Sequence, residues 1–268
     1  MRIRFYRPHG LRHVRTASGR NFNFYGGTFM AFSALWTEHG FWCIQEGGVR
    51  AFLIEGREKA VLIDTTRERG LYEFCRTITD KPIMVVLTHS DPDHISSNCE
   101  FEEIYLNPAD YAYYKTKADF LPQIHPIWEG DIIDLGNYIF EVFSIPGHTP
   151  GSIFLLERNR RFAIGGDSVQ TGPIFMFGPG RDMNAFIASM EKLMPYIAAM
   201  DTIYSSHNEL LINPMQIHAL HDGAISYLNG EAEYSEPDKE LPENIKLCTV
   251  GRANFYAEYI APAEQDGE

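Results

Sequence analysis

Short apolar runs separated by turn residues dominate the middle of the chain and predict β-strands. The runs 51–56 and 60–65 flank a Gly56-Arg57-Glu58-Lys59 turn, as two neighbouring strands would. Residues 83–88 are too short and too continuously apolar for a surface helix, so we expect a buried strand there. A short helix is expected at 70–79, and further strands are expected at 103–107, 131–135, 138–145, 152–157, 161–165 and 201–206.

Two later segments place apolar residues at helical spacing and predict helices that face the core. The first, 182–200, begins with a candidate N-cap, Asp182, and contains Pro195, which should kink the helix or end it early. The second is expected at 214–229, with an asparagine cap before it and a proline in its first turn. Residues 231–243 hold six acidic side chains and one lysine, which is typical of a solvated loop.

This order of elements predicts an α/β or α+β protein in which two sheets pack face to face with helices outside. We expect an N-terminal arm at 1–41 packed on the core, a main domain at 42–230, and a C-terminal extension at 231–268 that completes the same domain. Residues 1–40 hold six arginines against one acidic residue. A transit peptide can have that composition, but proline and glycine interrupt any helix here. We therefore expect the arm to dock on the acidic body or on a neighbouring subunit of a homodimer.

The composition excludes several classes of function. A net charge of −13 and a pI of about 5.2 argue against nucleic-acid binding, which needs basic patches. No apolar run approaches the ~20 residues that span a bilayer, and the N-terminus lacks the apolar part of a secretory signal. Four scattered cysteines without a C-x-x-C pair indicate reduced, buried thiols. We therefore expect a cytoplasmic protein that acts on a small-molecule substrate and binds neither nucleic acid nor membrane.

The most informative pattern is residues 88–94, Thr-His-Ser-Asp-Pro-Asp-His, which directly follow an apolar run. Four potential metal ligands this close cannot all bind one tetrahedral ion without strain, so they indicate two neighbouring ions. His148 lies in a Gly-His-Thr-Pro-Gly turn, Asp167 follows two glycines, and His207 follows another predicted strand. Because strand ends are where open α/β folds place their sites, this convergence predicts a dinuclear metal site.

These residues resemble the signature of the metallo-β-lactamase superfamily. That signature is His-x-His-x-Asp-His, then a histidine in a Gly-His-Thr turn, an aspartate after glycine, and a final histidine. The resemblance covers about residues 42–230 and implies an α+β fold, a four-layer αββα sandwich with the site at one edge of its two sheets. It also implies up to two divalent ions bridged by a hydroxide that attacks the substrate. Carried over by position, the first ion would be bound by His89 and His148 and the second by Asp93, His94 and His207, with Asp167 bridging them.

Asp91 stands where the family motif has its second histidine. In one interpretation Asp91 only forms hydrogen bonds within the loop, and the first metal site is lost or weak. In the other it binds the first ion as a carboxylate, a harder donor that shifts the preference from zinc toward iron or manganese. The flavodiiron branch of the superfamily carries glutamate at this position and binds iron. A redox protein of that kind needs an electron donor, and we expect no flavin domain in this chain.

The favoured function is a metal-dependent hydrolase of an ester, thioester, lactone or phosphodiester, with the substrate unassigned. The alternatives are a diiron oxidoreductase that reduces oxygen or nitric oxide with a separate electron donor, and a non-enzymatic sensor of a metal or ligand. Asp93 and Asp64 are the candidate catalytic residues. Asp64 is expected to orient a metal-bound histidine, with a buried turn-forming aspartate as the alternative. Arg181, in a glycine-rich loop, is a weaker candidate for anchoring a substrate carboxylate or phosphate, and a surface arginine is the alternative.

Several other side chains stay undecided at this level. His218 and His221 are three residues apart on a predicted helix, a spacing that a metal pair can have, although a partly buried structural pair fits it better. Tyr111, Tyr113 and Tyr114 are candidates for a pocket wall, and nothing in the sequence decides their role.

Overall fold

The computed structural model describes residues 4–5, 12–15, 21–25, 28–30, 32–117 and 121–260. Contacts between Cα atoms divide the chain into two compact units, Met1–Ile139 and Phe140–Glu268. The docking predicted for the arginine-rich arm depends on the arginine side chains of residues 1–20, which lie outside the side chains that the structure describes. The domain limits expected from the sequence stay a prediction.

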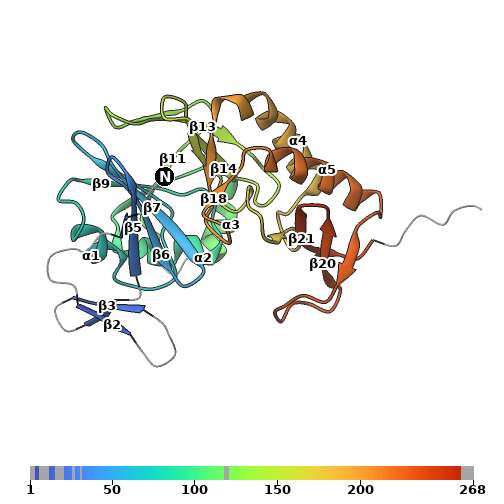
Figure 1. Cartoon of the computed structure of the whole chain (residues 1–268), viewed down its shortest axis with the longest axis horizontal. Helices are drawn as coiled ribbons and strands as arrows, with labels where there is room; N and C mark the ends of the chain where they lie inside the picture. Colours follow the sequence, from blue (N-terminus) through green and yellow to red (C-terminus); the bar gives the residue numbers. More distant parts are fainter. Residues whose placement is uncertain are drawn as a thin grey trace, which may run out of the picture. The chain divides into compact units, whose positions relative to one another are not determined.

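The first unit is built on an eight-stranded sheet in the order β1-β5-β6-β7-β8-β9-β10-β11 (Figure 1). Neighbouring strands are antiparallel from β1 to β8 and parallel from β8 to β11. Three short strands, β2, β3 and β4, form a separate antiparallel sheet. The strands are β1 (Arg4–Phe5), β2 (Arg12–Arg15), β3 (Asn21–Tyr25), β4 (Thr28–Met30), β5 (Phe32–Glu38), β6 (Phe41–Glu46), β7 (Val49–Glu55), β8 (Ala60–Ile63), β9 (Ile83–Val86), β10 (Glu103–Leu106), β11 (Gln123–Pro126) and β12 (Ile132–Asp134).

Short helices pack on this sheet, because the strands present apolar side chains to them. Phe74 from one helix and Tyr114 from another join Leu53, Leu62 and Val85 of the strands in one buried cluster. The burial of such a cluster is the main favourable contribution to the folding free energy of the unit. The helices are α1 (Leu71–Arg76), α2 (Pro92–Ile95) and α3 (Tyr111–Lys117), with 3₁₀ turns η1 (Ser96–Glu100) and η2 (Pro108–Asp110).

The second unit contains a mixed sheet in the order β13-β14-β15-β17-β18 and a smaller sheet in the order β16-β21-β20-β19. Helices α4 and α5 lie side by side, with β20 and β21 next to α5 (Figure 1). Phe154, Phe186, Leu220 and Phe255 meet in its core cluster. The elements are β13 (Ile139–Ser144), β14 (Ile153–Glu157), β15 (Phe162–Ile164), β16 (Ile174–Phe175), α4 (Met183–Leu193), η3 (Met194–Ala199), β17 (Thr202–Tyr204), β18 (Leu211–Ile212), α5 (Gln216–Leu228), β19 (Glu233–Ser235), β20 (Ile245–Val250) and β21 (Ala253–Glu258).

The predicted elements are present, and the sheets with separate helices confirm the α+β class. Asp182 caps α4 by accepting hydrogen bonds from two backbone N–H groups, and the α-helix ends at Leu193, two residues before Pro195. The prediction of a loop throughout 231–243 is wrong at β19, because Glu233–Ser235 pairs with β20 at the edge of a sheet. All four cysteines are free thiols, and three of them are buried. Within the described residues, no helix combines the length and the apolar composition needed to cross a membrane.

Candidate metal centre

Asp64 is the buried carboxylate at the end of β8. Its backbone N–H donates to the Val86 carbonyl at 2.9 Å, so the chain leaves β8 beside the end of β9. Its φ of +60° lies in the left-handed region, which aspartate tolerates better than most residues. Its Oδ1 accepts the Thr88 N–H at 2.6 Å, and its Oδ2 accepts the Thr88 hydroxyl at 2.7 Å. Asp64 therefore joins the ends of two neighbouring strands through a fully buried carboxyl group.

The same carboxylate orients two histidines. His94 Nδ1 lies 3.0 Å from Asp64 Oδ2, and His89 Nδ1 lies 3.0 Å from the Thr88 hydroxyl oxygen. The Thr88 hydroxyl donates its hydrogen bond to Asp64, so it accepts a hydrogen bond from His89 Nδ1. The tautomers of His89 and His94, with the proton on Nδ1, follow from this network. The ring centroids are 4.2 Å apart. Each ring thus keeps its Nε2 lone pair for a metal, the usual arrangement of a ligating histidine.

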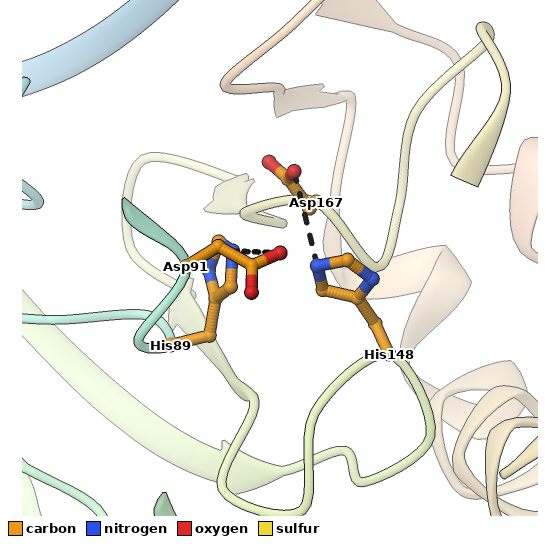
Figure 2. A group of neighbouring side chains, drawn as sticks. All are labelled: His89, Asp91, His148 and Asp167. Atoms are coloured by element: carbon orange, nitrogen blue, oxygen red, sulfur yellow. Dashed lines mark ion pairs between the residues drawn. The ribbon is translucent and has the colours of Figure 1, made fainter. Parts of the chain in front are cut away.

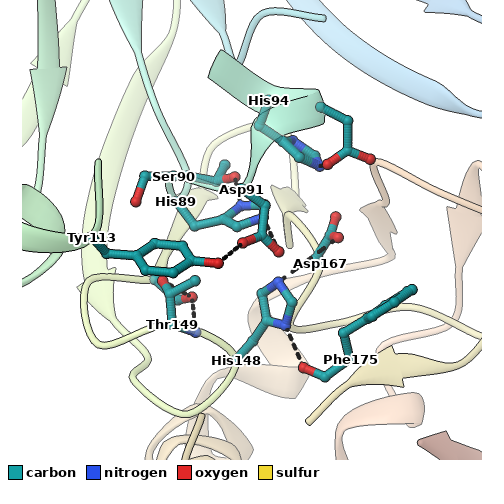
Figure 3. A network of polar contacts seen from close by, with 12 residues as sticks. His89, Ser90, Asp91, His94, Tyr113, His148, Thr149, Asp167 and Phe175 are labelled. Atoms are coloured by element: carbon teal, nitrogen blue, oxygen red, sulfur yellow. Dashed lines mark hydrogen bonds and ion pairs between the residues drawn. The ribbon is translucent and has the colours of Figure 1, made fainter. Parts of the chain in front are cut away.

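Asp91 lies between these histidines in the chain and immediately precedes the single turn of α2. Its Oδ1 accepts the Tyr113 hydroxyl at 2.9 Å, while its Oδ2 lies 3.7 Å from His89 Nε2 (Figures 2 and 3). The carboxylate therefore has one oxygen engaged by the protein and the other beside the Nε2 atom of a histidine. Because Tyr113 belongs to α3, this hydrogen bond joins Asp91 to an element outside its own loop, and the role of Asp91 as a metal ligand stays a prediction.

Asp93 has a different partner. Its Oδ2 forms an ion pair of 2.9 Å with the Arg67 guanidinium, whose side chain is 63% exposed. Its Oδ1 lies 3.9 Å from His94 Nε2. Arg67 is a residue that the sequence reasoning missed, since nothing in its local pattern connects it with the 88–94 motif.

His148 is held in the second unit by a tight turn after β13. Gly147 has φ +141° and lies against Phe186 of α4, where a Cβ would be 2.5 Å from the phenylalanine Cα. The Gly147 carbonyl also accepts the backbone N–H of Asp182 at 2.9 Å. His148 Nδ1 donates to the Phe175 carbonyl at 3.0 Å, and its Nε2 lies 3.8 Å from Asp167 Oδ2 (Figures 2 and 3).

Asp167 lies between two histidines of the same unit. It follows β15 after a glycine at φ +54°, Gly166, and its side chain is buried. Its Oδ1 is 3.4 Å from His207 Nε2, and its Oδ2 faces His148. His207 follows β17 in a turn where the Ser205 hydroxyl donates to the His207 carbonyl at 3.0 Å. The sequence-predicted ligands of this unit thus converge on one carboxylate.

The weaker candidates lie in other surroundings. Burial is the largest single influence on the pKa of His221 and lowers it. The contacts with Asp222 at 2.8 Å and Glu191 at 3.3 Å together outweigh burial, so the pKa is raised from its ordinary value. This network gives His221 a structural explanation on α5. Arg181 lies in the turn after Gly178, with its backbone N–H donating to the Gly178 carbonyl at 3.4 Å. Its role as a substrate anchor stays a prediction.

Comparison with known proteins gives one consistent result. A sequence profile of the Metallo-beta-lactamase superfamily matches residues 44–213. A hydroxyacylglutathione hydrolase of Francisella tularensis is 28% identical over 209 residues, which cover 76% of this chain and 81% of that protein. The chicken (Gallus gallus) acyl-coenzyme A thioesterase MBLAC2 is 24% identical over 202 residues, covering 60% and 72%. The solved structure of TTHA1623 in a di-iron-bound form has a TM-score of 0.52 at 22% identity, covering 63% of this chain and 91% of that one. The resemblance predicted from the motifs is confirmed.

Proposed function

Because the chain belongs to the metallo-beta-lactamase superfamily, we propose that its two groups of histidines and aspartates form one centre that binds two divalent metal ions. The family match runs through both units and includes every candidate ligand. In this proposal the first ion is bound by His89, Asp91 and His148, and the second by Asp93, His94 and His207, with Asp167 between them.

The observation that carries this proposal is the orientation of three imidazoles. His94, His89 and His148 each direct Nδ1 to an oxygen of the protein, at 3.0 Å in all three cases. A neutral imidazole fixed in this way presents the lone pair of Nε2, which is the form that binds metals. Mixed imidazole and carboxylate ligands fit zinc, iron and manganese, so these residues fit the ions that the family uses.

The reaction we propose is hydrolysis of a thioester. Two curated relatives support this choice by name, an acyl-coenzyme A thioesterase and a hydroxyacylglutathione hydrolase. Bound divalent ions supply Lewis acidity, which makes water a better nucleophile near neutral pH and polarises the acyl carbonyl. Arg67 holds Asp93 Oδ2, so Oδ1 would face the second ion, and the proton that the attacking water loses would pass to the leaving sulfur. The carbon–sulfur bond then breaks, and the thiolate leaves and takes up a proton, giving a free acid and a thiol. Asp64 keeps His89 and His94 in the required tautomers throughout.

Chelation tests the proposed function. We expect the purified full-length protein to release thiol from an acyl-coenzyme A or an S-acylglutathione, measured with a thiol-reactive dye. Dialysis against a chelator should reduce the rate to background, and zinc, manganese or iron should restore it. Full activity after complete metal removal would contradict a metal-dependent hydrolase. Oxygen consumption with a chemical reductant, without thioester turnover, would instead favour the diiron oxidoreductase.

Asp91→His should change the metal preference. An imidazole is a softer donor than a carboxylate and removes one negative charge, so the variant should take up more zinc relative to manganese and iron. Elemental analysis of protein grown with all three metals measures this ratio. Asp131→His, in an exposed turn, is the control and should keep the wild-type ratio. An unchanged ratio in Asp91→His would show that Asp91 is no ligand.

A further inference from the structure

The 88–94 loop is fastened to one side of the segment formed by η2 and α3. The Ser90 hydroxyl donates to Asp110 Oδ2 at 2.8 Å, and both residues are buried. The Tyr113 hydroxyl donates to Asp91 Oδ1 at 2.9 Å. Asp110 and Tyr113 are three residues apart, so their side chains emerge on the same side of a helical segment. Two consecutive loop residues are therefore held by two neighbouring side chains of a different segment. Figure 3 shows the contact between Tyr113 and Asp91.

We propose that Tyr113 is a positioning residue that makes Asp91 a ligand through one oxygen only. The inference rests on the proposed function, since it concerns the first metal ion of that centre. A carboxylate can bind an ion through one oxygen or through both. Oδ1 accepts the tyrosine hydroxyl and Oδ2 faces His89, so the ion would contact Oδ2.

The geometry of Oδ2 fits this role. It lies 3.7 Å from His89 Nε2. Two ligand atoms at about 2.1 Å from a tetrahedral ion are roughly 3.4 Å apart, so a displacement of a few tenths of an ångström brings this pair to coordination distance. Tyr113 thus holds Asp91 close to its binding position before any ion arrives, which lowers the cost of ordering the carboxylate on binding.

The chemistry of the partner also matters. Asp93 is paired with a guanidinium, which offsets its charge, whereas the hydroxyl of Tyr113 is neutral and leaves the charge of Asp91 in place. Lys117 lies one turn further along α3 and places its ammonium over the Tyr113 ring, 5.4 Å from the ring centre. The tyrosine therefore orients Asp91 through a hydrogen bond from a neutral donor.

Removal of the hydroxyl should weaken one of the two ions. In Tyr113→Phe the ring remains but Oδ1 loses its donor, so Asp91 can rotate away from His89. Loss of a partner that holds a metal ligand typically costs about 10- to 100-fold in affinity, and we expect a loss in this range for one ion while the other is unchanged. Equilibrium dialysis against manganese and zinc, each followed by elemental analysis, measures both affinities. Tyr111→Phe is the matched control, because Tyr111 lies on the same helix and packs against the apolar core.

A double-mutant cycle separates positioning from a general structural effect. If Tyr113 acts through Asp91, Tyr113→Phe should cost nothing further in an Asp91→Asn background. The metal-free Tyr113→Phe and wild-type proteins should also unfold at the same temperature. Equal losses in both backgrounds, or a lower melting temperature of the metal-free variant as the only change, would overturn the proposal. Absence of bound metal from the wild-type protein would instead refute the proposed function itself, so the two failures are distinguishable.

Discussion

Asp64→Asn is expected to lower the affinity for divalent ions by about 10- to 100-fold and to reduce thioester hydrolysis accordingly. Asparagine has the size of aspartate and tolerates the φ of +60° at this position, so the backbone should be preserved. In the wild-type protein the Asp64 oxygens accept hydrogen bonds from the Thr88 N–H, the Thr88 hydroxyl and His94 Nδ1. The asparagine amide replaces one of these acceptor oxygens by an NH₂ group, which can only donate. With an amide nitrogen facing it, His94 Nδ1 becomes the acceptor, and the ring proton moves to Nε2, where it blocks metal binding.

Isothermal titration of the metal-free protein with zinc measures this loss. Thr88→Val and Thr88→Ser form a matched pair, since serine keeps the hydroxyl that links His89 to Asp64 and valine removes it. We expect valine to weaken metal binding and serine to be close to wild type. Asp201→Asn, at an exposed ion pair with Arg161, should leave the affinity unchanged. Wild-type affinity in Asp64→Asn would mean that Asp64 is only a buried turn residue.

Gly147→Ala is expected to lower the free energy of unfolding by about 3 kcal/mol or more, because strain and overpacking add at this position. The φ of +141° is unfavourable for any side chain. The added Cβ would also lie 2.5 Å from both Cα and Cβ of Phe186, so either the turn or α4 must shift. Because His148 follows directly, the shift should also loosen its bond to the Phe175 carbonyl.

Urea unfolding measures this effect, and a second glycine provides the control. Gly178 has φ +88° but no heavy atom within 4 Å of an added Cβ. Gly178→Ala should therefore show the backbone penalty alone, about 1–2 kcal/mol. If both variants lost the same stability, the close approach of α4 to Gly147 would have no energetic role.

Local patterns were sufficient for the strands and helices that the sequence analysis predicts, because each of these depends on neighbours in sequence. The apolar run before His89, the N-cap of Asp182 and the early end of α4 before Pro195 all follow from nearby residues. The strand β19 escaped prediction because its three residues gain their structure from pairing with β20, a partner more than ten residues away. β16 and β18, with two residues each, are too short for any periodicity to be visible.

The sequence by itself determined the types of side chain in the site and their positions at strand ends, because the ligand motif and the apolar runs before it are local. It also indicated that Asp91 departs from the family pattern. Only the tertiary structure decided which atom of each histidine is engaged, and that Tyr113 and Arg67 are the partners of Asp91 and Asp93. The bonds to Asp91 and Asp93 join residues more than twenty positions apart, so they depend on how the strands and helices pack. The sequence thus shows that Asp91 departs from the family motif, and only the fold shows that Tyr113 is its hydrogen-bond partner.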